Sequence, residues 1–262
     1  MLSPAGDASH LPRYRFPAGF VLRWLASAAL RRRRVLTADA QALIKRHPAP
    51  CVLDAIRLPE AGSFVLVLNH YERPGMPVWW SALYVEAVLT AERPGLEVRW
   101  MVANRLAAVR IRRVPVVPES AMRWFVSRVA STYGALLVDP RDPRRRARVL
   151  REARRVLTRG EVVAITPEAG NPPGRHGQLR TAVSASGSAI GWLSGGRVPV
   201  VPVGLWEDRD GRVFIRVGES RTLQPKSHAT AEEMTTEVMM RIARLLPPEL
   251  RGPYGIIEEG GP

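Results

Sequence analysis

The alternation of short apolar runs with longer helical patterns is the feature of this sequence that most restricts its fold. Short apolar runs predict strands buried on both faces of a sheet, and they occur at Phe64–Leu68, Val98–Val102, Ala135–Val138, Val162–Ile165 and Val198–Val203. Helical patterns between them predict helices at Val78–Thr90, Ser120–Thr132, Arg144–Thr158 and Thr181–Leu193. This order predicts an α/β fold, with a central, mostly parallel sheet flanked by helices.

The ends of the chain add further elements to this sheet. Val213–Val217 predicts an edge strand and Glu232–Leu246 a closing helix. A helical pair, Phe16–Leu30 and Asp39–His47, precedes the sheet, and the prolines at 48 and 50 end its second helix. We therefore expect a helical extension over residues 1–50, a single α/β domain over 51–250, and a tail over 251–262.

The chain is strongly basic, and the excess is local. It carries 39 Lys and Arg against 24 Asp and Glu, a net charge of +15, and residues 99–159 hold 16 arginines against four acids. A local basic surface attracts anionic groups such as lipid headgroups or a phosphate-bearing substrate. The simpler alternative is a solvated helix face in an arginine-rich protein. Only the charge points to nucleic acid, without a motif that reads it, so we expect no nucleic-acid partner.

The first helix is too short to span a bilayer, but it is apolar and four arginines, Arg31–Arg34, follow it. These features predict a helix lying in the membrane interface, with Phe16, Phe20, Trp24 and Leu25 in lipid. The alternative is a helix packed on its own domain. The single cysteine, Cys51, excludes an internal disulfide and favours a reducing compartment. We therefore expect a cytoplasmic protein peripherally associated with the inner face of the cell membrane.

The first core strand leads directly into a turn that contains a histidine. Asn69 and His70 follow Leu68, and the turn is set by Pro74 and Gly75. Polar residues at the carboxyl ends of parallel strands form sites in open α/β sheets. An imidazole titrates near neutral pH, so His70 is placed to act as a general base, although a lone histidine is more often structural. The other histidines show no metal-ligand spacing, and we expect no metal site.

Three later segments also end strands with polar or turn-forming residues. Residues 134–139 read G-A-L-L-V-D, with Arg141 just beyond, and residues 166–171 read T-P-E-A-G-N. Residues 198–203 read V-P-V-V-P-V, which is unusual because proline cannot donate to a sheet ladder.

In this order the four segments resemble the blocks of the glycerolipid acyltransferases, typified by bacterial 1-acyl-glycerol-3-phosphate acyltransferase. That family reads N-H-x-x-x-x-D, G-x-I-F-I-D-R, F-P-E-G-T-R-S and V-P-I-V-P-V. The resemblance implies transfer of a fatty acyl group from acyl-CoA or acyl-carrier protein to a hydroxyl of a lysophospholipid or related lipid, without a cofactor. It makes His70 the general base. It also implies substrate contacts by Asn69, Arg73, Arg141, Glu168 and Arg180, although Arg73 could instead tie down its turn.

The sequence departs from the family at the carboxylate that orients the histidine. Gly75 stands where the family has Asp, and Ala169–Pro172 replace G-T-R-S. Glu72 is the expected replacement for the missing carboxylate, with Glu168 and Glu86 as alternatives. A catalytically inactive relative that binds lipid or acyl groups is the other interpretation. The tryptophans at 79, 80, 100, 124 and 192 either line an acyl groove or fill the core.

Overall fold

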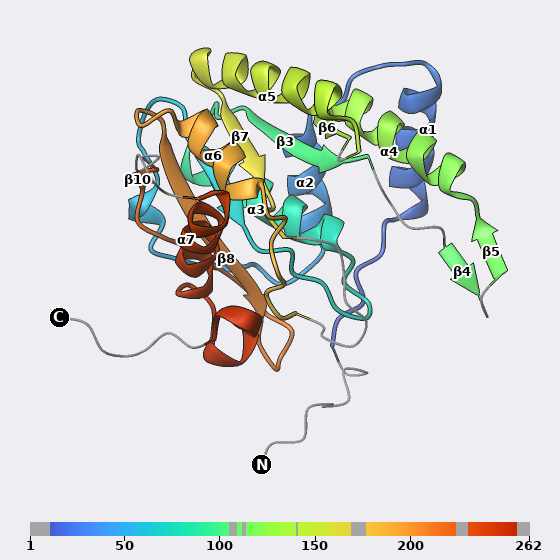
Figure 1. The fold of residues 1–262 in the computed structure, drawn as a ribbon. Helices are drawn as coiled ribbons and strands as arrows, with labels where there is room; N and C mark the ends of the chain where they lie inside the picture. The colour runs from blue at the N-terminus through green and yellow to red at the C-terminus, as the bar shows by residue number, and fades with distance from the viewer. Residues whose placement is uncertain are drawn as a thin grey trace.

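The computed structural model of the chain describes residues 11–104, 109–111, 114–139, 141–168, 177–223 and 230–255. It is an α/β fold built on one open sheet (Figure 1). The helices of the described residues are α1 (Ala18–Ala29), α2 (Leu36–Ile44), α3 (Val78–Glu92), α4 (Glu119–Tyr133), α5 (Pro143–Thr158), α6 (Ser186–Ser194) and α7 (Ala231–Ala243). The strands are β1 (Cys51–Leu53), β2 (Val65–Leu68), β3 (Val98–Ala103), β4 (Val109–Ile111), β5 (Val114–Val117), β6 (Leu136–Val138), β7 (Val162–Ile165), β8 (Pro199–Glu207), β9 (Val213–Val217) and β10 (Arg221–Thr222).

The main sheet has the order β1-β9-β8-β2-β7-β3-β6, with β10 added beside β8. Every neighbouring pair is parallel except β8–β9 and β8–β10. The helices α5, α6 and α7 cover one face of the sheet, and α2 and α3 cover the other (Figure 1). This confirms the predicted fold class, including the helical pair that precedes the sheet.

The five predicted core strands are confirmed, with small shifts at their ends. The central strand β2 is buried along its whole length, as its apolar sequence requires. Its neighbour β8 continues past the predicted end at Val203 to Glu207. The two prolines of β8 lie in the first half of the strand. The second half, which pairs with β9 in antiparallel register, contains no proline, so no proline removes a donor from that ladder.

Two details of the predicted topology are wrong. Val213–Val217 is not an edge strand, because Cys51–Leu53 forms β1 on its outer side, in parallel register with Phe214–Arg216. The strand β1 is only three residues long and directly follows a proline-rich segment. It is therefore too short to show a hydrophobic period in the sequence. The helix predicted at Thr181 begins at Ser186 instead, because Ala182 forms a bridge with Glu168 and the Val183 N–H donates to the Pro167 carbonyl at 2.9 Å.

The helical extension packs into the same core as the sheet. Tyr14 is buried, and α2 lies against α3 with Ala40, Leu43 and Ile44 in the main hydrophobic cluster. The helices α1 and α4 pack beside each other at the β6 end of the molecule (Figure 1). Within the described residues, no helix combines the length and the apolar character needed to cross a membrane.

Candidate functional site

The turn after β2 sends alternate side chains to opposite sides. Asn69 and Arg73 point toward β8, whereas His70 and Glu72 point toward Arg180, which precedes α6. Extended backbone alternates its side chains with a period of two, so this separation continues the pattern of the strand itself. The predicted site residues therefore divide into two groups, although four of them lie within five consecutive positions.

The first group holds the fold together. The Asn69 amide donates to the Leu205 carbonyl and accepts from the Leu205 N–H, both at 2.8 Å, which extends the β2–β8 ladder by one residue. Arg73 forms a buried ion pair with Glu207, and it also donates to the carbonyls of Pro74 at 2.8 Å and Pro12 at 2.9 Å. These contacts give Asn69 and Arg73 structural roles, in line with the alternative that Arg73 ties down its turn, and their substrate contacts stay predictions.

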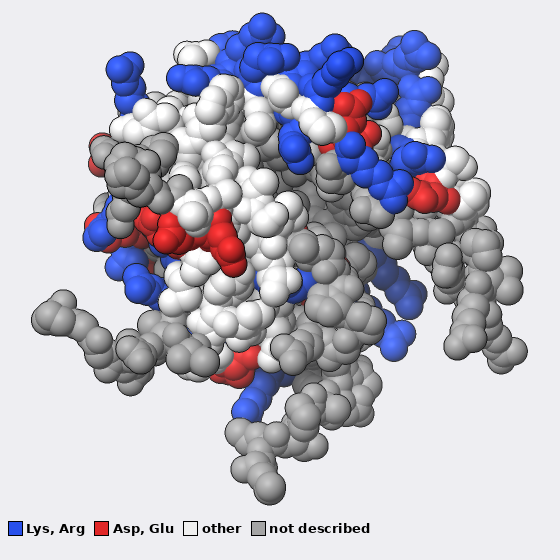
Figure 2. Space-filling view, in the orientation of Figure 1, with Lys and Arg blue, Asp and Glu red and all other residues white. Residues whose placement is uncertain are grey.

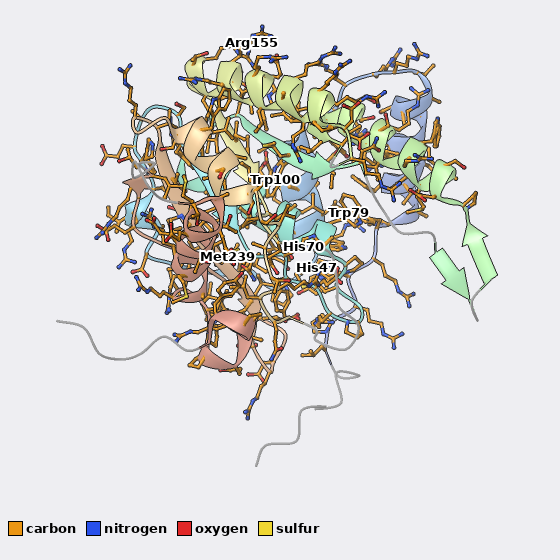
Figure 3. All side chains as sticks on the ribbon, in the orientation of Figure 1. His47, His70, Trp79, Trp100, Arg155 and Met239 are labelled. Atoms are coloured by element: carbon orange, nitrogen blue, oxygen red, sulfur yellow. The ribbon has the colours of Figure 1, made fainter. Side chains whose placement is uncertain are left out.

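The second group forms a polar cluster around His70, and we call His70, Glu72, Glu168 and Arg180 the His70 cluster. Arg180 places Nη1 3.2 Å from His70 Nδ1 and Nη2 3.1 Å from a Glu72 carboxylate oxygen. Figure 3 places His70 near the middle of the molecule, below β3 and far from Arg155 on α5. The structure thus brings together four residues that are separated by up to 110 positions along the chain.

Glu168 holds the two loops of this cluster in register. One carboxylate oxygen accepts from the backbone N–H of His70, and the other accepts from the backbone N–H of Arg180 at 2.7 Å. Burial raises the pKa of Glu168 to about 7, against the two N–H donors, which lower it. Since both oxygens are engaged by backbone groups, the Glu168 carboxylate positions the turn and does not orient the imidazole ring.

The contact between Arg180 and His70 fixes the tautomer of the imidazole. A guanidinium group has only donors, so His70 Nδ1 must accept and the ring proton lies on Nε2. Burial and, to a smaller extent, the positive charge of Arg180 lower the pKa of His70 to about 4, while the charge of Glu72 opposes them. His70 is therefore neutral at pH 7, with its lone pair directed at Arg180.

The Glu72 carboxylate pairs with Arg180, and among the described residues no hydrogen bond joins it to the imidazole. The orienting role expected for Glu72 therefore passes through the guanidinium group. The alternative Glu86 lies on α3, where it accepts from Trp100 Nε1 at 2.9 Å and Thr37 Oγ1 at 2.7 Å. That carboxylate belongs to the packing between α2, α3 and β3.

Arg141 lies at the same edge of the sheet but away from the His70 cluster. It is exposed just before α5, and its backbone N–H donates to the Asp139 carboxylate at 3.1 Å. The strand β6 is three places from β2, which corresponds to about 14 Å at the usual strand spacing. The structure therefore does not bring Arg141 to His70.

Sequence reasoning missed the residue that anchors the loop carrying Arg180. The Gly177 N–H donates to the Glu72 carbonyl at 2.8 Å, and a Cβ at Gly177 would lie 2.9 Å from the Tyr71 ring. Its φ of +76° also favours glycine. The glycines near residue 177 were the sequence feature that could have indicated this loop. They did not indicate which residue the loop would contact.

The predicted acyl-groove tryptophans do not form one surface. Trp80 and Trp100 are buried in the core, whereas Trp124 on α4 and Trp192 on α6 are exposed. A cavity of about 510 Å³ lies between β6 and α5, lined by Leu136, Arg148, Arg151 and Arg155 among others, and it includes no residue of the His70 cluster. Within the described chain, no group of three or more His, Cys, Asp or Glu side chains is arranged to hold a metal ion.

No protein-family model matches the chain, and a search of curated proteins found no match. The function is therefore inferred from the His70 cluster, the surface of the molecule and the sequence resemblance.

Proposed function

We propose that this protein is an acyltransferase that moves a fatty acyl group from acyl-CoA or acyl-carrier protein to a hydroxyl group of a lysophospholipid or related lipid. The observation that carries the proposal is the convergence of His70, Glu72 and Arg180 at the carboxyl end of the central strand β2. His70 and Glu72 belong to the first of the sequence segments that resemble acyltransferase blocks, and Arg180 lies nine residues after the third. A base, a carboxylate and a phosphate-binding cation are the groups that this chemistry requires.

The reaction needs one proton acceptor and one source of positive charge. The acceptor hydroxyl attacks the thioester carbonyl carbon while His70 takes its proton, and a tetrahedral intermediate forms. The carbon–sulfur bond then breaks, and the leaving thiolate takes the proton back from the imidazolium. Arg180 is placed to hold an anionic group of the substrate or the developing oxyanion, because guanidinium binds such groups through paired N–H donors.

His70 cannot act as the base while Arg180 donates to Nδ1, since that contact occupies the only free lone pair of the neutral ring. We propose that an anionic substrate group draws Arg180 away from the imidazole. Glu72 then loses its partner as well. The imidazole releases its Nε2 proton to solvent and takes one up at Nδ1, where Glu72 accepts it, and the free lone pair of Nε2 takes the hydroxyl proton. Substrate binding would thus convert His70 from a hydrogen-bond donor into a base.

The same contact favours a second candidate function. Arg180 at Nδ1 and Gly75 at the place of the family's aspartate both fit a relative that binds lipid or acyl groups without transferring them. In that protein the His70 cluster would be an anion-binding site, and His70 would donate through Nε2–H.

The proposed setting is the inner face of the cell membrane, with the protein on the cytoplasmic side and bound to anionic lipids. Arginine side chains cover the surface over α5 and continue toward α1 and α4 (Figure 2), and seven of them on α5 are exposed: Arg144, Arg145, Arg146, Arg148, Arg151, Arg154 and Arg155. A positive surface of this kind attracts an anionic leaflet. We propose no cofactor and no nucleic-acid partner.

Acyl transfer by a His70→Ala variant tests the proposal. Purified protein is supplied with acyl-CoA or acyl-carrier protein and a panel of lysophospholipids and other lipid alcohols, and the products are identified by mass spectrometry. Loss of a general base lowers the rate by about 10²–10⁴-fold. Glu219→Gln serves as the control, because Glu219 is an exposed carboxylate paired only with Arg221 among the described residues.

Two results separate the two candidate functions. If His70→Ala removes transfer while the melting curve is unchanged, the acyltransferase proposal holds. If the wild-type protein transfers nothing to any acceptor but binds a fluorescent acyl-CoA or lysophospholipid, the binding-only alternative replaces it.

A further inference from the structure

Two helices at the β6 end of the molecule expose large apolar side chains. Leu22 and Leu25 project from α1, and Trp124 and Phe125 project from α4, with Leu22 66% and Trp124 59% exposed. We call these four residues the α1–α4 surface. Single exposed apolar residues are common in soluble proteins, but two adjacent helices that each expose several indicate an interaction site.

The helix α1 is apolar on both its inner and its outer side. Trp24 and Ala28 point inward and are buried, and the Trp24 ring lies 5.4 Å from the Phe125 ring of α4. Leu22 and Leu25 lie on the outer side. A helix with large apolar residues on two sides is normally covered on both, so the side of α1 that carries Leu22 and Leu25 lacks the partner that its sequence predicts.

This arrangement corrects the expected lipid-facing residues. Trp24 packs on α4, and Phe20 is half-buried and stacked on Phe16, which in turn stacks on Trp80. Of the four residues expected in lipid, Leu25 is the one that projects freely from α1. The sequence also gave no reason to include α4, whose Trp124 is the largest apolar group on this surface.

The charges around the α1–α4 surface are almost all positive. Glu119 is the one acidic residue within α1, α4 and residues 30–35. Besides Arg34, which pairs with Asp39, six arginines of these segments are exposed or half-exposed: Arg23, Arg31, Arg32, Arg33, Arg123 and Arg128. An apolar centre with a cationic rim complements an anionic bilayer, in which acyl chains lie beneath negative headgroups.

We infer that the α1–α4 surface is where this protein docks on an anionic lipid bilayer, with Trp124 as its interfacial anchor. Tryptophan suits this position because its ring is apolar and its indole N–H reaches the polar headgroup region. Arg128 stacks on the Trp124 ring at 5.6 Å, which places a cation beside the anchor. The inference rests on the proposed membrane setting and deepens it by naming the surface.

Point substitutions test the surface, because deletion of the N-terminal segment would also remove the buried residues Tyr14 and Trp24. Binding to phosphatidylcholine vesicles with and without phosphatidylglycerol is measured by sedimentation for Trp124→Ser and for the pair Leu22→Ser and Leu25→Ser. Each change removes about 1.5–3 kcal/mol of apolar transfer energy, so we expect a roughly tenfold to hundredfold loss of binding. Trp192→Ser is the matched control, since Trp192 is also exposed and also carries an arginine, Arg154, 5.0 Å from its ring.

A second measurement keeps the apolar surface intact. In Trp124→Phe, quenching of tryptophan fluorescence by vesicles of brominated phosphatidylcholine and phosphatidylglycerol should fall, whereas Trp192→Phe should leave it unchanged. Unchanged binding in the serine variants, or unchanged quenching in Trp124→Phe, overturns the inference while leaving membrane binding elsewhere intact. A wild-type protein that does not bind these vesicles overturns the membrane setting and this inference together. A wild-type dimer that Trp124→Ser converts to a monomer, without effect on vesicle binding, assigns the surface to a second copy of the chain.

Discussion

Two arginine–glutamate pairs lie on either side of the turn after β2, and they differ in what surrounds them. Arg73 and Glu207 are almost fully buried, with side chains 5% and 0% exposed, and the guanidinium also binds two backbone carbonyls. Arg180 is equally buried, but its partner Glu72 is 21% exposed. Among the described residues, Arg180 Nε has no hydrogen-bond partner, and Nη1 is shared with His70.

The comparison shows how position gives one pair of residue types two different roles. The Arg73–Glu207 pair satisfies its own polar groups and joins the turn to β8 and to the N-terminal segment. The Arg180–Glu72 pair retains an unsatisfied donor, and a buried donor without a partner is costly unless a ligand supplies one. We therefore interpret the first pair as structural and the second as the substrate-binding side of the turn.

Breaking the structural pair should produce the largest loss of stability. Arg73→Ala leaves the Glu207 carboxylate buried without its partner, which costs about 3–5 kcal/mol in the free energy of unfolding. Urea denaturation followed by circular dichroism measures the loss. Arg221→Ala is the control, because the Arg221–Glu219 pair has the same chemistry at 2.7 Å but lies on the surface. Equal losses of stability in Arg73→Ala and Arg221→Ala would show that Arg73 does not have the structural role assigned to it.

Breaking the second pair should cost less stability but change the imidazole. Arg180→Gln removes a charged hydrogen-bonding group, worth about 1–3 kcal/mol, while the partly exposed Glu72 can be hydrated. Without the Arg180 charge the pKa of His70 rises from about 4, and burial, the larger cause, keeps it below the ordinary value of 6.5. Titration of the His70 ring signals by NMR measures this rise, and an unchanged pKa would remove Arg180 from the His70 cluster.

The direction of the pH dependence follows from the same values. The unfolded chain binds more protons than the native state between pH 6.5 and 4 at His70, so the free energy of unfolding falls as the pH falls through that range. In Arg180→Gln the pKa of His70 is higher, so the pH range over which His70 lowers the free energy of unfolding is narrower. The contribution of His70 to that loss is then smaller. Glu168 acts in the opposite direction, because its raised pKa of about 7 favours the native state at low pH. For this reason the NMR titration of His70, and not the overall slope, is the deciding measurement.

Part of this site was predictable from the sequence, and the physical reasons are clear for each residue. His70 was predicted because it directly follows a buried strand, and polar residues at strand ends mark the edge of a parallel sheet. Arg180 was predicted only because the resemblance to the acyltransferases implies a substrate contact there. The side chains of Glu72 and Arg73 point to opposite sides because extended backbone alternates its side chains with a period of two. The turn residues Pro74 and Gly75 obscured this alternation in the sequence. Glu207 could not be predicted as the partner of Arg73. The two residues are 134 positions apart, and their contact depends on how far β8 extends past Val203.

The smallest effect concerns the position where the acyltransferases that this sequence resembles carry aspartate. Gly75 has φ of +85°, and a Cβ there would lie 3.2 Å from both Arg13 Cγ and Arg73 Nη1. In Gly75→Asp the new carboxylate would therefore sit beside Arg13 and Arg73, on the structural side of the turn, and would not reach His70. The left-handed backbone should cost about 1 kcal/mol, partly offset by attraction to the two arginines, so we expect a small change in the melting temperature and no gain in acyl transfer. The matched variant Gly62→Asp, with φ of +78° and open space around its Cβ, measures the backbone cost alone. A rise in transfer activity in Gly75→Asp, but not in Gly62→Asp, would contradict this assignment, because it would mean that a carboxylate from the structural side of the turn can still orient the imidazole.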